Sequence, residues 1–243
     1  MSAKRKTILV FQHLDVEHPG VFRDFLAADG FDYVPVELDA GDLVPSLDGV
    51  AALWVMGGPM DVWQTDSHPW LIPEQAAIRE AVVTRQLPFL GFCLGHQLLA
   101  AALGGEVGPA ALGEVGIMPV ERCDADAPSP FLAGMPSTLQ VLQWHGAEVQ
   151  RLPPGGRALM HSPRCAVQAM SVGERAFSMQ FHLEITDETV PQWRAIPEYR
   201  AALEQHLGPE GAITLEREAA ACVPAFNQWA HHLYRNWRAA CGL

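Results

Sequence analysis

The chain has few basic residues and no long apolar run. Its 243 residues include 16 lysines and arginines against 28 aspartates and glutamates, which gives a formal net charge of −12. An acidic surface repels nucleic acid and anionic lipid, so we expect neither as a partner. No stretch approaches the roughly 20 apolar residues that span a bilayer. The apolar run that follows the basic residues 4–6 is too short for a signal peptide.

Cysteine is sparse, and the common cofactor motifs are missing. The five cysteines are odd in number and widely spaced, which predicts no disulfide framework and favours a reduced, cytoplasmic setting. Cys93 and His96 have C-x-x-H spacing, but no second pair completes a metal site. The chain has no GxxxxGK[ST] loop and no convincing GxGxxG after a strand. We therefore expect no metal, no ATP and no dinucleotide cofactor.

The first half of the chain alternates short apolar runs with amphipathic segments. Hydrophobic residues make up 49% of the sequence and charged residues 18%, which is enough for a substantial core. Alternating strands and helices predict an α/β fold with a doubly wound, mostly parallel central sheet. The predicted strands are residues 8–11, 33–38, 51–56 and 88–92, and the predicted helices are residues 20–28, 74–85 and 96–103.

The pattern changes after Gly105. Helix signals become sparse, so this half is expected to add antiparallel strands at residues 114–121, 139–144, 158–162, 166–170 and 176–182. The region after Glu184 has helical periodicity. We expect one domain at residues 1–185 and a helical extension at residues 186–243 that packs on it. A partner-binding or dimer face is the alternative role for these helices.

The segment around Cys93 predicts a nucleophile. A short apolar run ends in Gly-x-Cys-x-Gly at residues 91–95, and an apolar helical pattern follows immediately. This is the layout of a nucleophile elbow, in which flanking glycines let a strained strand-to-helix turn close. The helix N-terminus there favours a thiolate. The alternative is a cysteine that only packs in the core.

A second segment, residues 176–184, predicts a general base. The segment alternates like a strand, so His182 and Glu184 would share one face. A carboxylate beside a histidine fixes the imidazole tautomer and stabilises the imidazolium that forms during reaction. Taken alone, His182 would be an ordinary structural histidine. Together with Cys93, it favours a Cys-His-Glu catalytic set.

These residues resemble a known family. Cys93 within GFCLGHQ and the pair His182 and Glu184 within QFHLE are similar to the triad of class I glutamine amidotransferases, in particular the stand-alone, GMP-synthase-like members. Two further matches are Met-Gly-Gly-Pro-Met at residues 56–60 and Trp-His-Gly at residues 144–146. The resemblance extends from about Ile8 to Glu184, so residues 1–185 would form the amidotransferase domain.

The resemblance implies further site residues. Backbone N–H groups of Gly58 and Leu94 would form the oxyanion hole, and Gly57, Gln97 and Gly146 would bind the substrate. Two positions depart from the family pattern, since Leu183 replaces a proline and Ala147 replaces an aspartate. Trp63 and Trp70, in the loop at residues 61–73, would either form a lid over the pocket or cover the core edge.

The resemblance also implies a reaction. Glutamine would lose its side-chain ammonia through a γ-glutamyl thioester on Cys93. The residues after Glu184 are too few for an ATP-using domain, so ammonia would pass to a separate ATP-dependent synthetase subunit. Two alternatives stay open at this point. The protein would hydrolyse γ-glutamyl peptides or amides alone, or it would be a non-catalytic regulatory binding protein on the same scaffold.

Overall fold

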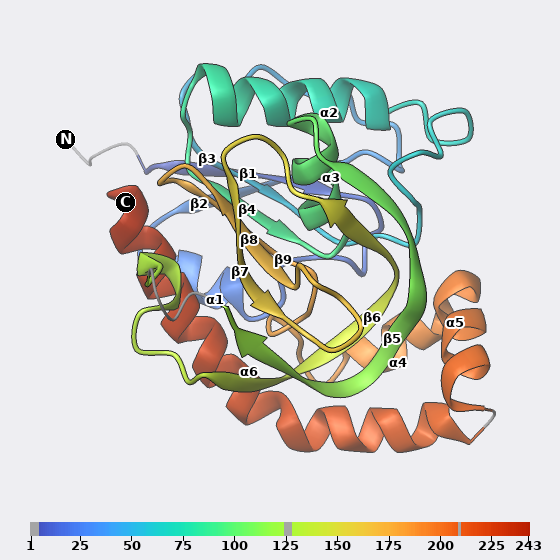
Figure 1. Ribbon diagram of the computed structural model, residues 1–243. Helices are drawn as coiled ribbons and strands as arrows, with labels where there is room; N and C mark the ends of the chain where they lie inside the picture. Colours follow the sequence, from blue (N-terminus) through green and yellow to red (C-terminus); the bar gives the residue numbers. More distant parts are fainter. Residues whose placement is uncertain (1–4, 124–127, 209) are drawn as a thin grey trace.

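A mixed β-sheet organises the molecule, and helices cover both of its faces (Figure 1). The computed structural model describes residues 5–123, 128–208 and 210–243. Within these residues the sheet has nine strands in the order β2-β1-β3-β4-β9-β8-β7-β5-β6. The strands are β1 (Thr7–Gln12), β2 (Asp32–Glu37), β3 (Val50–Val55), β4 (Phe89–Phe92), β5 (Glu106–Arg122), β6 (Thr138–Arg151), β7 (Gly156–His161), β8 (Ala169–Val172) and β9 (Ala176–Met179).

The helices follow the strands in the first half of the chain and dominate its end. They are α1 (Phe22–Ala28), α2 (Leu71–Arg79), the π-helical turn η1 (Glu80–Thr84), α3 (Leu94–Ala102), the 3₁₀ turn η2 (Pro130–Leu132), α4 (Thr189–Ala195), α5 (Pro197–Leu207) and α6 (Gly211–Cys241). In the part of the chain that the structure describes, no helix is both long and apolar enough to cross a membrane.

The expected fold class is confirmed. Strands β2, β1, β3, β4 and β9 pair in parallel, and β8, β7, β5 and β6 extend the sheet with antiparallel pairing. In the parallel half, Phe11 pairs with Val55, and Val55 pairs with Gly91. The carboxyl ends of these strands therefore lie along one edge of the sheet, where open α/β sheets carry their binding sites.

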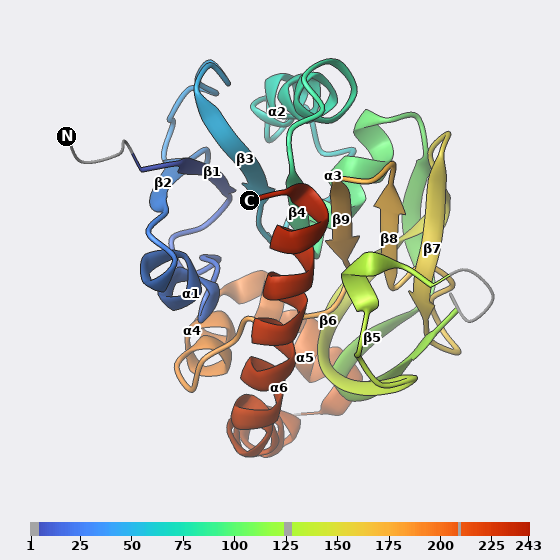
Figure 2. The ribbon, with the colours of Figure 1, turned by 90° about the vertical axis from the view of Figure 1, so that its left-hand side faces the viewer.

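Alternate residues of each strand feed two separate cores. Ile8 and Val10 of β1 pack on the side of α1 and α6, whereas Leu9 and Phe11 pack on the side of α2 and α3. Figure 2 shows α6 running along its face of the sheet. Trp237 of α6 is fully buried, and its indole N–H donates to the Phe89 carbonyl at 2.9 Å. Burial of one such large side chain stabilises the fold by about 1.5–3 kcal/mol.

Several expected element boundaries are wrong, and the largest shifts are in β5, which begins at Glu106 instead of residue 114, and in β6, which continues to Arg151 instead of ending at residue 144. Strand β9 ends at Met179 rather than continuing through His182, because the His182 backbone pairs instead with Leu142 of β6. Strand β8 begins at Ala169, three residues later than expected. The Gln168 N–H donates to the Met160 carbonyl, and the Gln168 carbonyl accepts from the Gln180 N–H. Helix α2 begins at Leu71 and becomes π-helical at Glu80.

Candidate active site

Cys93 occupies the sharp turn between β4 and α3. Its φ of 48° and ψ of −103° are strained for a residue with a side chain. Glycine is required on each side of Cys93 because a side chain there would clash with neighbouring backbone. A Cβ on Gly91 would lie 2.7 Å from the Gly95 carbonyl oxygen, and a Cβ on Gly95 would lie 2.1 Å from the Val55 carbonyl oxygen. The sequence motif thus produces the elbow for a steric reason, and the elbow presents the thiol at the N-terminus of α3.

His182 and Glu184 lie beside the elbow and are buried. The His182 Nδ1 atom is 2.5 Å from Glu184 Oε1, and Glu184 Oε2 accepts the Leu183 N–H at 2.9 Å. Burial alone would lower the pKa of His182. The Glu184 charge and hydrogen bonds to Cys93 and Glu184 outweigh it and raise that pKa well above its ordinary value. With Nδ1 held by Glu184, the Nε2 atom is the one available to Cys93.

The Gly57–Gly58 turn follows β3 and lies against the elbow. A Cβ built on Gly57 would be 3.6 Å from the Cys93 Cβ, and one built on Gly58 would be 3.0 Å from the Leu94 side chain. Among the described residues, neither the N–H of Gly58 nor that of Leu94 donates to a backbone carbonyl. In the described part of the chain these two N–H groups therefore lie at the elbow without a backbone acceptor.

Gln97 connects the elbow helix to two other elements. Its amide nitrogen donates to the Ala147 carbonyl at 3.2 Å and to Gln180 Oε1 at 3.1 Å. The Gln180 amide nitrogen lies 3.5 Å from the Cys93 sulfur. Gly146 is exposed and lines the same cavity as Cys93. The structure thus brings Gln97 and Gly146 to the site, and it adds Gln180, which sequence reasoning missed.

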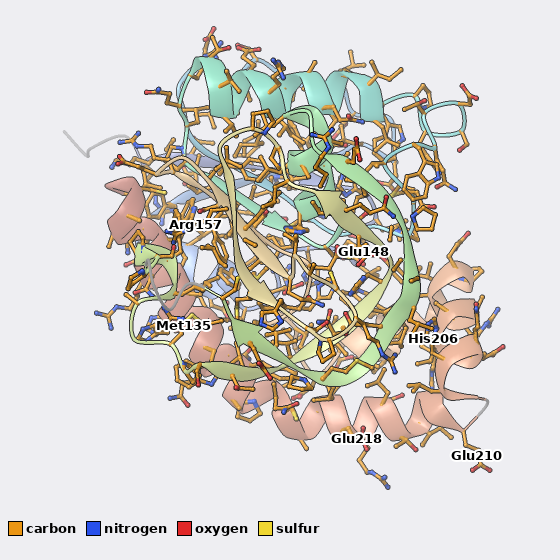
Figure 3. The ribbon with its side chains drawn as sticks, in the orientation of Figure 1. Met135, Glu148, Arg157, His206, Glu210 and Glu218 are labelled. Carbon is orange, nitrogen blue, oxygen red and sulfur yellow. The ribbon has the colours of Figure 1, made fainter. Side chains whose placement is uncertain are left out.

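A cavity of about 480 Å³ opens at Cys93. The elbow, the Gly58 turn, β5, β6 and α5 contribute its walls. His206 of α5 faces β5 (Figure 3), where a Cβ on Gly113 would lie 2.9 Å from its Nε2 atom. Helix α5 therefore contributes directly to the wall of the pocket.

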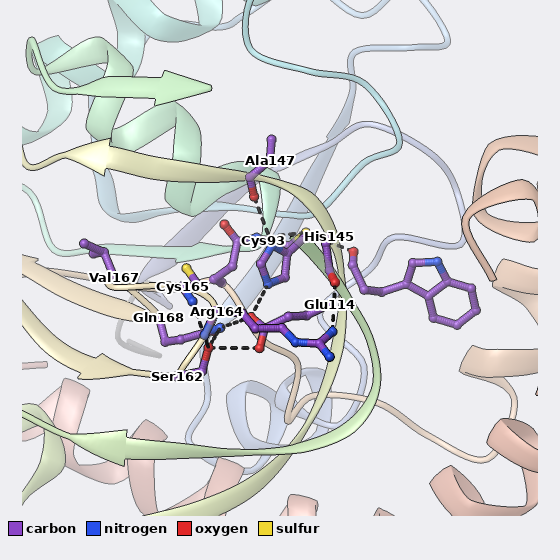
Figure 4. Close-up of polar contacts among 12 residues, drawn as sticks. Cys93, Glu114, His145, Ala147, Ser162, Arg164, Cys165, Val167 and Gln168 are labelled. Atoms are coloured by element: carbon purple, nitrogen blue, oxygen red, sulfur yellow. Dashed lines mark hydrogen bonds and ion pairs between the residues drawn. The ribbon is translucent and has the colours of Figure 1, made fainter. Parts of the chain in front are cut away.

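A buried polar network supports the β6 side of the cavity (Figure 4). His145 contacts the Ala147 carbonyl at 3.0 Å through Nδ1 and Glu114 at 3.1 Å through Nε2. Glu114 also accepts from Ser162 at 2.9 Å and from Gln168 at 2.6 Å. Because the Ala147 carbonyl also accepts from Gln97, this network holds the wall in a fixed position relative to the elbow helix.

Two further buried pairs lie next to the glycine turn, and sequence reasoning missed both. His13 bonds Glu74, and Tyr199 of α5 donates to Glu17. A signal for Glu74 existed, since it falls on the apolar stripe of Ala77 and Ile78 where an unpaired charge is costly. No sequence pattern pointed to Glu17.

The two loop tryptophans lie in different environments. Trp70 stacks on the buried His13 ring, with ring centroids 5.4 Å apart and an interplanar angle of 16°. Trp63 is 44% exposed. Trp70 therefore covers a buried histidine.

Among the described residues, no group of three or more His, Cys, Asp or Glu side chains could hold a metal ion.

Comparison with known proteins identifies a family and several relatives. The family described as "Glutamine amidotransferase class-I" matches residues 29–192. A glutamine-hydrolyzing GMP synthase of Aeropyrum pernix is 35% identical over 166 residues, which are 68% of this chain and 28% of that protein. A protein of Thermococcus kodakarensis, named as one subunit of a glutamine-hydrolyzing GMP synthase, is 37% identical over 111 residues. These residues are 45% of this chain and 57% of that protein.

The solved structure of a glutamine amidotransferase from Methylobacillus flagellatus has a TM-score of 0.86 and 29% identity. The similarity covers 98% of this chain and 96% of that chain, so it includes the C-terminal helices. By contrast, the chain spans under a third of the Aeropyrum pernix enzyme.

Proposed function

The chain belongs to the glutamine amidotransferase class-I family, and from this premise we propose that it hydrolyses the side-chain amide of glutamine through a thioester on Cys93. The observation that carries the proposal is the convergence of two sets of groups on the strained Cys93, which lines the cavity. These are the buried His182–Glu184 pair and the N–H groups of Gly58 and Leu94. A sulfur nucleophile, a base with its orienting acid, and oxyanion donors are the parts that acyl transfer needs.

The first half of the reaction forms the thioester. His182 holds the thiol proton at Nε2, in keeping with its raised pKa, and the deprotonated Cys93 sulfur attacks the amide carbon of glutamine. The amide oxygen becomes an oxyanion that accepts from the N–H groups of Gly58 and Leu94. His182 then donates its proton to the amide nitrogen, the carbon–nitrogen bond breaks, and ammonia leaves. Glu184 holds the imidazolium in place during these steps.

The second half of the reaction releases glutamate. A water molecule attacks the thioester carbon while His182 takes its proton, and the same two N–H groups stabilise the second oxyanion. Collapse of this intermediate expels the Cys93 sulfur as a thiolate, and His182 keeps the proton that it took from water. Gly57, Gln97 and Gly146 contribute to substrate binding in this proposal. Their support is that Gly57 lies against Cys93, while Gln97 and Gly146 line the cavity.

The test is direct. Purified protein is incubated with glutamine, and ammonia and glutamate are measured in equal amounts, with Cys93→Ala as the control. Turnover that disappears in the folded Cys93→Ala variant supports the proposal, and turnover that persists refutes it. A folded wild-type protein that hydrolyses neither glutamine nor γ-glutamyl amides would instead support the non-catalytic alternative.

The proposal has two versions, which differ in whether the released ammonia passes to a synthetase. The relative from Thermococcus kodakarensis is named as one subunit of a larger synthase, which supports a separate ATP-dependent synthetase as the acceptor. A second candidate rests on the cavity. Its volume of about 480 Å³ lies in the range of about 300–1,000 Å³ that encloses drug-sized ligands, so it has room for a γ-glutamyl peptide or amide.

One assay separates these candidates. The isolated chain is given glutamine and a series of γ-glutamyl peptides. A higher kcat/KM for a peptide favours the stand-alone hydrolase. Glutamine turnover that is weak alone and rises on addition of a co-purified synthetase favours a role as the glutaminase component of an amidotransferase.

A further inference from the structure

His13 lies at the same edge of the sheet as the glycine turn. It follows β1 directly, and Gly57 and Gly58 follow the neighbouring strand β3. The His13 side chain is fully buried, and its Nδ1 atom lies 2.7 Å from the Gly57 carbonyl oxygen. A Cβ on Gly58 would lie 2.9 Å from the His13 Cβ. The histidine is therefore in direct contact with the turn that supplies one proposed oxyanion donor.

The contacted carbonyl and the proposed donor belong to the same peptide unit. The C=O of Gly57 and the N–H of Gly58 share one rigid plane and point in opposite directions. A hydrogen bond that fixes the carbonyl consequently fixes the direction of the N–H. It also polarises the peptide, because successive hydrogen bonds in a chain strengthen one another.

The chemistry of the partners assigns the ring protons. A carbonyl oxygen only accepts, so the His13 Nδ1 atom must carry a proton. The Nε2 atom lies 2.8 Å from Glu74 Oε1 on α2, and both side chains are fully buried. An ionised carboxylate also only accepts, so an ionised Glu74 requires a second proton on the ring. His13 is then a buried imidazolium that donates from both nitrogens.

The surroundings of His13 favour this charged form. Burial lowers the pKa of His13, but Glu74, the Gly57 carbonyl and the nearby Glu17 together raise it above its ordinary value. The charged groups that act on the ring are thus Glu74 of α2 and Glu17 of the loop after β1. Trp70 stacks on the ring face, where a cation is attracted by the indole.

We propose that His13 and Glu74 are positioning residues that hold and polarise the Gly57–Gly58 peptide, so that the Gly58 N–H is aimed and strengthened for the oxyanion. This inference rests on the proposed function, since the peptide needs this preorganisation only if an oxyanion forms at Cys93. Glu74 favours the protonated form of His13, and the Nδ1 proton of His13 polarises the Gly57–Gly58 peptide, so its N–H becomes a stronger donor to the reacting oxygen. Neither side chain touches substrate.

Three variants separate this role from simple packing. His13→Asn keeps an amide donor near the Nδ1 position but loses the charge and the link to Glu74. His13→Leu removes the donor altogether and keeps the bulk. Glu74→Gln keeps the acceptor for Nε2 and removes the negative charge. We expect kcat to fall about 10- to 100-fold in His13→Leu, as when outer-shell partners of metal ligands are lost. Losses should be smaller in the other two, and KM should change by less than about threefold.

Alkylation of Cys93 by iodoacetamide, followed on its peptide by mass spectrometry, gives a second readout. Displacement at a saturated carbon forms no oxyanion, so its rate should stay within about twofold in all three variants. A kcat of His13→Leu within about threefold of wild type would overturn the proposal. So would an alkylation rate that falls in parallel with kcat, because the substitution would then have disturbed the nucleophile itself. If His13→Leu does not fold, the same criteria apply to Glu74→Gln.

The charge state of His13 is tested without any turnover. Nitrogen NMR of the histidine ring in wild-type protein at pH 8 should show protons on both nitrogens, and Glu74→Gln should lose one. A neutral ring with its single proton on Nδ1 would mean that His13 carries no positive charge, and this would overturn its polarising role. If wild type hydrolyses no glutamine or γ-glutamyl amide but His13 is doubly protonated, the proposed function fails and the oxyanion role with it. Slow turnover in variants of an active enzyme tests the inference alone.

Discussion

His182 Nδ1 lies 2.5 Å from Glu184 Oε1 although no regular strand holds the two residues on one face. Strand β9 has ended at Met179, and a single bridge to Leu142 fixes the His182 backbone. The His182 N–H donates to the Leu142 carbonyl at 2.9 Å, and the Leu142 N–H returns a bond of 3.3 Å. The placement of the pair therefore depends on β6, which is far from it in the sequence.

The first prediction concerns Glu184→Gln. The substitution keeps the shape of the side chain but leaves an imidazolium at His182 without its counter-charge. We expect kcat to fall by roughly 100-fold or more, with little change in fold. Steady-state glutaminase assays and circular dichroism check both statements. A kcat within about threefold of wild type would show that His182 needs no carboxylate.

The same variant carries a pH dependence of stability. The folded-state pKa of His182 lies well above its ordinary value, against the effect of burial and mainly because of Glu184. The pair therefore stabilises the fold fully below about pH 6.5, the unfolded pKa, and this stability is lost as pH rises through the folded pKa. Denaturant unfolding of wild type and Glu184→Gln should differ more at pH 6 than at pH 10. An equal difference at both pH values would contradict the assignment.

The second prediction tests Gln180, whose amide nitrogen lies 3.5 Å from the Cys93 sulfur. A hydrogen bond to a charged group contributes about 1.5–3 kcal/mol, so Gln180→Leu should slow Cys93 alkylation by roughly tenfold. The matched control is Gln143→Leu. Gln143 is also a buried glutamine, but its amide has no hydrogen-bond partner among the described residues. Alkylation that slows equally in both variants would assign the effect to packing.

The third prediction concerns backbone strain at Cys93. Its φ of 48° is unfavourable for any residue with a Cβ, and such strain costs about 1–3 kcal/mol. Cys93→Ala keeps this strain, whereas Cys93→Gly relieves it. We therefore expect the glycine variant to unfold at higher denaturant concentration than the alanine variant, although glycine ordinarily destabilises relative to alanine. The reverse order would mean that the elbow is not strained.

The elbow and the parallel strands could be predicted because each has a local signature, whereas His182 and Glu184 are predicted only in combination with Cys93 and the family resemblance. Two flanking glycines mark a sharp turn, and buried parallel strands are continuous apolar runs. The end of β9 could not be anticipated, since the alternating pattern continues past Met179 while the pairing changes to β6. Buried polar pairs such as Tyr199 and Glu17 join elements that are far apart in the chain, and the periodicity of the sequence does not predict such pairs.

The fourth prediction compares two glycines of the site. A Cβ on Gly95 would lie 2.1 Å from the Val55 carbonyl oxygen, whereas a Cβ on Gly146 would meet nothing within 4 Å. The Val55 backbone cannot move aside as a flexible side chain can. Gly95→Ala should therefore lower the free energy of unfolding by roughly 3 kcal/mol or abolish folding. Gly146→Ala should change the free energy of unfolding by less than about 0.5 kcal/mol. Comparable stability of the two variants would show that the elbow can open.

The fifth prediction follows from Glu17, which is buried beside the active site and accepts a hydrogen bond from Tyr199. Burial and the Glu184 charge raise its pKa above the ordinary value, against the opposing effects of His182 and Tyr199. The folded state therefore retains the Glu17 proton to a higher pH than the unfolded state does. It follows that stability declines as pH rises from the unfolded pKa, about 4.5, through the higher folded pKa.

Glu17→Gln removes this titration and keeps an oxygen that accepts from Tyr199. We expect the variant to gain stability relative to wild type as pH rises from 4.5 to 8, because wild type alone must ionise a buried carboxyl over that range. Urea unfolding at several pH values measures the difference. A difference that stays constant with pH would mean that Glu17 titrates alike in the folded and unfolded chains, and that its burial is offset by His182 and Tyr199.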